Sequence, residues 1–194
     1  KDGTFGASDQ LGSLTIQPGG VVTHSARFVD GLVLNVTGTL DVQAGGLIDV
    51  NSKGLRGGGV SGSVFGTAGE TFDGADAIVA GASAGGTDYS GASYGGRGVD
   101  TPAGVTNAVY GVLEDPRHLG SGAGSYAFYL SGGNGGGRVR VMASTAIVDG
   151  TIRANGDGGS GHGGGSGGAL RLAVGNLSGS GAIQANGGGY YVPG

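Results

Sequence analysis

Arg140 and Arg171 are the two side chains whose type and spacing most clearly suggest binding chemistry. They lie 31 residues apart and occupy the same position in two similar segments. If these segments pair as strands in that register, the two guanidinium groups lie about 5 Å apart and repel each other unless an anion intervenes. A sulfated or uronic sugar would supply that anion, and so would an aspartate of the same chain.

Acid–base chemistry is the second possibility. Asp41 and Asp49 would project from equivalent strand positions, and Arg153 would point outward from a strand of its own. A polysaccharide lyase or hydrolase needs such groups to converge in one cleft. The same pattern is typical of a solvated sheet face, and no Gly-x-Ser-x-Gly elbow precedes a helix. We therefore expect that the chain is not an enzyme, and keep a lyase or hydrolase as the second alternative.

Metal ligands are sparse in the sequence. Cysteine is absent. His24, His118 and His162 are scattered, and His162 lies in a glycine loop without a second ligand at metal spacing. The loop Asn155-Gly-Asp-Gly-Gly-Ser160 partly matches a calcium-binding loop, but it lacks the repeated aspartates of known calcium motifs. We expect no cofactor, with calcium at this loop as the remaining alternative.

Tyrosines are the other candidates for contact with a sugar or a protein partner, because they combine an aromatic ring with a polar hydroxyl. A carbohydrate-binding adhesin predicts a shallow groove with exposed aromatic rings, whereas a structural fibre predicts that tyrosines and the ends of the fold are buried between subunits. The candidates are Tyr89, Tyr94, Tyr126 and Tyr129 in the glycine-rich middle, and Tyr190 and Tyr191 near the end.

Composition limits the classes to which the chain can belong. It has 51 glycines but only 4 prolines and no glycine at every third position, which excludes collagen. Charged residues make up 12% and aliphatic residues recur in bursts, unlike a disordered chain. The net charge of −4 and the lack of a basic run argue against nucleic acid as a partner, and no apolar stretch reaches the roughly 20 residues of a membrane span. Lys1 in place of Met suggests a processed or partial chain, and hence export.

A 31-residue repeat organises the C-terminal part. Residues 137–142 and 150–156 return as 168–173 and 181–187, each with the apolar alternation of a strand that has one buried face. Such a short unit cannot close its own core, so neighbouring copies must pack on one another. Residues 12–16, 32–36, 38–42 and 46–50 follow the same pattern near the N-terminus.

These patterns predict one domain over residues 1–194. Its parts are N-terminal strands over 1–53, a glycine-rich insertion over 54–136 and the repeat over 137–194. The predicted fold class is all-β, a right-handed parallel β-helix or solenoid with long glycine-rich, polyproline-II-like excursions. The insertion could be a flexible linker or an ordered excursion of extended chains, and we favour order because its tyrosines and leucines offer something to bury.

The order of glycine-rich motifs over residues 94–98, 110–114, 119–124, 150–156 and 163–168 resembles that in repeats of large exported, adhesin-like β-helical surface proteins. The resemblance extends from about residue 38 onward, and it brings no catalytic motif. It implies an extracellular, cell-surface scaffold. Because the open ends of a solenoid must be capped or paired, we expect a structural protein that is a subunit or segment of a self-assembling fibre or sheath, with a carbohydrate-binding adhesin module as the alternative. The expected partners are other copies or neighbouring domains of a longer chain, and cell-surface polysaccharide is a further candidate.

Overall fold

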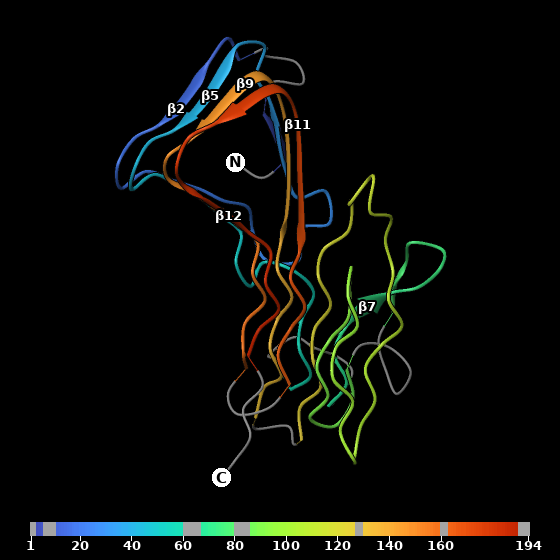
Figure 1. Cartoon of the computed structure of the whole chain (residues 1–194). Coiled ribbons are helices and arrows are strands. Elements are labelled where there is room, and N and C mark those ends of the chain that lie inside the picture. The colour runs from blue at the N-terminus through green and yellow to red at the C-terminus, as the bar shows by residue number, and fades with distance from the viewer. Residues whose placement is uncertain are drawn as a thin grey trace.

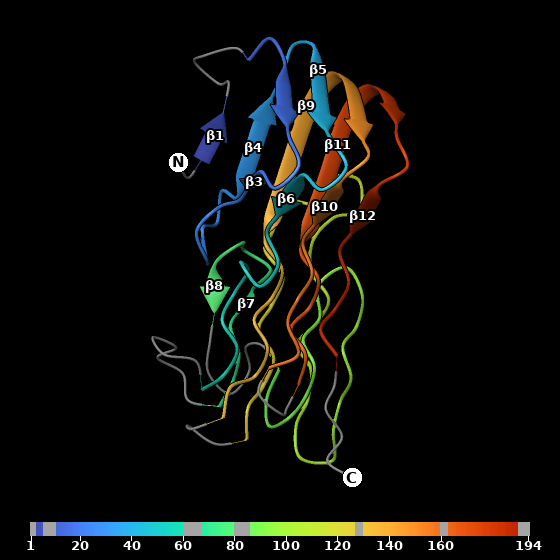
Figure 2. The ribbon, with the colours of Figure 1, turned by 90° about the vertical axis from the view of Figure 1, so that its left-hand side faces the viewer.

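Most of the strands lie at one end of the molecule and most of the glycine-rich segments at the other (Figure 1). The computed structural model describes residues 3–5, 11–59, 67–79, 86–126, 130–159 and 163–189. Within these ranges the chain forms three β-sheets and no helix. Turning the molecule shows most of the strands side by side at one end, with extended segments running from them toward the other end (Figure 2).

The largest sheet is parallel throughout and is organised around its longest strand, β9 (Arg138–Val148). One edge of β9 pairs with two shorter strands in succession, β4 and then β5, and its other edge pairs with β11. Outside β4 and β5 lie β1 and β2, respectively. The five shorter strands are β1 (Gly3–Phe5), β2 (Leu14–Ile16), β4 (Leu32–Asn35), β5 (Thr39–Val42) and β11 (Ala169–Ser178).

The second sheet is also parallel, with the order β12-β10-β6-β3. Register partners in the C-terminal part are 31 residues apart: Ala169 lies beside Arg138, and Ala182 beside Thr151. The third sheet is an antiparallel hairpin formed by β7 and β8. The bounds of these strands are β3 (Val21–Val22), β6 (Leu47–Asp49), β10 (Thr151–Arg153), β12 (Ala182–Gln184), β7 (Thr71–Phe72) and β8 (Ile78–Val79).

The apolar core joins the two parallel sheets. Alternate residues of β4, β5 and β9 are buried, as expected for strands with one face in a core. Val139 from the first sheet and Ile48 and Ile152 from the second are fully buried in the same cluster. The short strands are therefore held by packing between sheets as well as by their ladders.

The glycine-rich half is held by its backbone. The amide of Leu55 donates to Gly120 O at 2.9 Å, and its carbonyl accepts from Gly135 N at 2.9 Å, so one extended segment bonds to two others. A Cβ placed on Gly122 would lie 1.9 Å from Arg56 O. No side chain fits between segments that approach so closely, which explains why glycine fills these positions.

The predicted right-handed parallel β-helix or solenoid is wrong. The described residues instead form three separate sheets, two parallel and one antiparallel, and the order of strands in the largest sheet does not follow the chain. After β6 the chain leaves the parallel sheets and returns only with β9, which lies beside both β4 and β5. Parallel strands are usually connected through helices. Here glycine-rich extended segments make several of those connections, and the sequence pattern did not indicate where they leave and rejoin the sheets.

Candidate functional site

The face of the molecule formed by the last strands is the first candidate site. We call it the C-terminal face, and it consists of β11, β12 and the extended segment 185–189. β11 pairs only with β9, and β12 only with β10, among the residues that the structure describes. One edge of each strand is thus left without a partner strand in the described ranges.

Residues on this face are exposed where their register partners are buried. Ile183 is 43% exposed, whereas Ile152 beside it is 0% exposed. Leu177 is likewise 55% exposed, whereas its register partner Ala146 is fully buried. The last strands therefore carry core-type side chains without the cover that the preceding strands have.

The glycine-rich part of the face shows the same contrast. A Cβ on Gly156 would lie 2.2 Å from Gly165 O, so a neighbouring backbone fills that space. At Gly187, 31 residues later, the nearest atom would be 3.7 Å away. A hollow of about 720 Å³ is lined by Gly165 and Gly187, together with Tyr94, Val109 and Leu113. We call this hollow the C-terminal groove.

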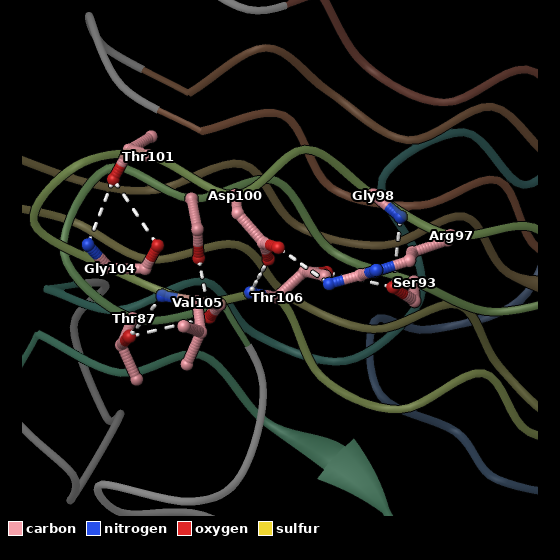
Figure 3. A network of polar contacts seen from close by, with 10 residues as sticks. Thr87, Ser93, Arg97, Gly98, Asp100, Thr101, Gly104, Val105 and Thr106 are labelled. Carbon is pink, nitrogen blue, oxygen red and sulfur yellow. Dashed lines mark hydrogen bonds and ion pairs between the residues drawn. The ribbon is translucent and has the colours of Figure 1, made fainter.

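A polar network holds the loop that borders the groove (Figure 3). The hydroxyl of Thr101 donates to Asp88 O at 2.9 Å and accepts from Gly104 N at 2.9 Å. Asp100 accepts the amide of Thr106 at 2.9 Å and pairs with Arg97. Side-chain oxygens thus replace the ladder hydrogen bonds that this irregular segment lacks, and they fix its shape.

The structure brings Arg140 and Arg171 together as register partners in β9 and β11. Arg171 Nη1 lies 2.9 Å from Asp115 Oδ1, so an aspartate of the same chain supplies the counter-charge. Arg138 lies two residues before Arg140 on the same strand face. Burial, and then the charge of Arg140, lower the pKa of the Arg138 guanidinium.

The other predicted charged residues do not share a cleft with these arginines. Arg153 pairs across the second sheet with Asp49 at 2.6 Å, and Asp41 accepts a hydrogen bond from Gln43 at 3.2 Å. Burial acts to raise the pKa of Asp49. The hydrogen bonds from Arg153 and from Asn51 N–H, with the charges of Arg153 and Lys53, outweigh it and lower that pKa.

The predicted tyrosines are divided between different environments. Tyr89 and Tyr126 stack with ring centroids 4.7 Å apart, and Tyr126 is 57% exposed. Tyr94 is buried against Tyr110, and burial raises the pKa of both phenols. Tyr129, Tyr190 and Tyr191 lie outside the described residues.

A second hollow, of about 550 Å³, lies between the β7–β8 hairpin and residues 107–118. We call it the hairpin pocket. Asp76 at the hairpin turn pairs with Arg117 at 2.7 Å and with His118 Nε2 at 2.8 Å. The rings of Phe72 and Tyr110, 5.7 Å apart, belong to the same pocket. Sequence reasoning missed this site because its two sides are about 40 residues apart in the chain; the Asp73-Gly74 turn was the only local signal.

The proposed calcium loop uses its carboxylate internally. Asp157 Oδ1 accepts the amides of Asn134 at 2.9 Å and Gly159 at 3.0 Å, while Ser160 and His162 lie outside the described residues. In the described ranges, no three His, Asp or Glu side chains are grouped in a way that could hold a metal ion.

No helix in the described ranges is suited to cross a membrane. No protein-family model, curated protein or solved structure matches the chain, so the geometry of its own faces and pockets is the basis for a functional proposal.

Proposed function

We propose that the chain is a non-enzymatic structural segment of an extracellular surface fibre or sheath, and that copies join through the C-terminal face. The observation that carries this proposal is the exposure of Ile183 and Leu177 beside register partners that are completely buried. A second copy laid against β11 and β12 would give these side chains the cover that β9 and β10 already have.

The edge strands favour such pairing because they lack the usual protection. Soluble proteins protect exposed sheet edges with charges, prolines or bulges, since unpaired backbone groups recruit other strands. β11 carries one charged residue, Arg171, and no proline, while β12 reads Ala-Ile-Gln. An added strand would form backbone hydrogen bonds along the edge and bury apolar side chains at alternate positions.

The opposite edge of the sheets offers a matching surface on the second copy. β2 reads Leu-Thr-Ile and β3 reads Val-Val, so neither strand carries a charge, and each pairs with one strand among the described residues. Neighbouring strands are parallel within each of the two sheets, so a C-terminal edge can continue into the N-terminal edge of the next copy without reversal. Such a head-to-tail contact forms a closed ring only when the rotations between successive copies add up to a full turn. Otherwise it produces a filament.

The experiment compares wild-type protein with an edge-blocked variant, Leu177→Lys with Ile183→Lys. Light scattering after size exclusion and negative-stain electron microscopy would follow both proteins across a concentration series. The matched control is Val105→Lys, which adds a lysine at a loop position that is 61% exposed. We expect uniform filaments from wild type and the control, and monomers from the edge-blocked variant. Wild-type monomers at every concentration, or filaments from the edge-blocked variant, would contradict the proposal.

A further inference from the structure

We infer that the hairpin pocket binds a neutral sugar unit, independently of any assembly through the C-terminal face. The pocket lies between the β7–β8 hairpin and residues 107–118, and its volume of about 550 Å³ falls within the usual range of small-molecule sites. It combines an aromatic and aliphatic wall with a small group of polar side chains at one side.

The wall suits the apolar face of a pyranose ring. Tyr110 is partly exposed and packs against Phe72, and Val109 and Val112 are 51% and 54% exposed in the same lining. The faces of aromatic rings carry partial negative charge and attract the C–H groups that one side of a sugar presents. The exposed valines beside the partly exposed Tyr110 leave apolar surface that a ligand would cover, while Phe72 supports the Tyr110 ring from the core side.

The polar side provides acceptors and donors next to each other. Asp76 and Arg117 are 2.7 Å apart, and their side chains are 50% and 52% exposed. The carboxylate has several acceptor sites and the guanidinium five N–H donors, so their mutual contact leaves further bonding capacity on both. Adjacent hydroxyls of a sugar, each able to donate and accept, match such a pair.

The charges of the pocket favour a neutral ligand over an anionic one. Arg117 is already paired with Asp76, and a second carboxylate in the lining, Asp73, accepts the hairpin amides of Ala75 and Ala77 at 2.8 and 2.9 Å. The lining therefore holds two carboxylates, one guanidinium and His118, and both the guanidinium and the imidazole are already bonded to Asp76, so among the described residues no unpaired cation is left there for a uronate or a sulfate.

A buried network keeps the two sides of the pocket in place. Asn107 Nδ2 donates to Thr71 Oγ1 at 3.0 Å, which ties residues 107–118 to the hairpin. The hydroxyls of Thr71 and Ser121 are 2.7 Å apart, and Tyr110 donates to Leu119 O at 2.6 Å. Walls that are fixed before binding lose little conformational freedom when a ligand arrives.

The test is an amide NMR titration with D-glucose, D-galactose, D-mannose and N-acetyl-D-glucosamine, with D-glucuronate as the anionic comparison. We expect at least one neutral sugar to shift the amides of Val109, Val112 and Arg117, and to bind more tightly than glucuronate. Asp76→Asn should weaken that binding about tenfold or more while the hairpin stays folded, since asparagine tolerates the positive φ of 60° at this position.

Two further variants separate this site from the rest of the surface. Arg117→Gln should also weaken binding, whereas Arg97→Gln, which breaks another exposed ion pair, should bind like wild type. If no neutral sugar shifts the pocket amides, or if Asp76→Asn and Arg117→Gln bind as well as wild type, the inference is wrong. Shifts confined to the Tyr89–Tyr126 stack would also overturn it, because they would place the sugar outside the hairpin pocket.

Discussion

In the strand-rich half the chain segments pack through side chains, whereas in the glycine-rich half they pack through the backbone itself. Leu40, Ile48 and Val139 fill the core between the parallel sheets and are fully buried. In the other half a Cβ on Gly122 or Gly168 would lie within 2 Å of a carbonyl oxygen of another segment. Truncating a buried side chain should therefore destabilise the strand-rich half, and adding a side chain at a glycine should destabilise the glycine-rich half.

Truncating a core side chain tests the strand-rich half and should have the largest effect. Ile152→Ala should lower the free energy of unfolding by about 2–5 kcal/mol, because it leaves a cavity at a fully buried site. Ile183→Ala, at the register partner on the C-terminal face, should cost less than about 1 kcal/mol in the monomer. Urea unfolding of dilute protein measures both. Equal losses of stability in the two variants would mean that Ile183 is covered as well as Ile152, which would contradict an exposed C-terminal face.

Adding a methyl group tests the glycine-rich half. Gly122→Ala should lower the free energy of unfolding by about 1–3 kcal/mol, because the new Cβ would force the segment around Arg56 away and break its hydrogen bonds. The control is Gly12→Ala, where no atom lies within 4 Å of an added Cβ. The same denaturation experiment compares the two variants, and similar small losses at both positions would argue against close backbone packing.

Acid titration tests a side-chain interaction of the strand-rich half and should have the smallest effect. The pKa of Asp49 is lowered in the folded state. Its carboxylate therefore stabilises the fold above the unfolded-state pKa of about 3.9, and this stabilisation is lost as the pH falls through the folded-state pKa. Asp49→Asn should cost about 1 kcal/mol or less near neutral pH, because the ion pair with Arg153 is partly exposed.

The measurement for this pair is urea unfolding between about pH 2 and pH 7. The difference in stability between wild type and Asp49→Asn should shrink as the pH falls below about 4. A difference that stays constant across this range would show that the carboxylate charge does not stabilise the fold.

Local patterns in the sequence predicted more of the strands than of their arrangement. The alternation around Val139 and Leu170, and the 31-residue offset between the two copies, match the pairing of β9 with β11 and of β10 with β12. The predicted fold class failed because strand order depends on where the glycine-rich segments leave and rejoin the sheets. Glycine-rich sequence carries no periodicity that marks such points.

Of the candidate sites, the sequence predicted only the contacts between residues at equivalent positions of the 31-residue repeat. The 31-residue offset brought Arg140 and Arg171 together, but it could not indicate that Asp115, from the glycine-rich region, pairs with Arg171. The hairpin pocket depends on contacts such as Asp76 with His118, which join segments that share no sequence pattern. Exposed tyrosines could not be told from buried ones, because Tyr94 and Tyr126 have similar glycine-rich neighbours.

The most direct test of backbone packing in the glycine-rich half is amide hydrogen exchange. The amides of Gly120 and Gly136 each donate to a carbonyl of another segment at 2.9 Å. If these bonds hold that half together, both amides should exchange only through large-scale unfolding, with protection close to that of the paired amides of β9. Exchange of Gly120 and Gly136 at nearly unprotected rates, while β9 remains protected, would contradict the packing described for this half.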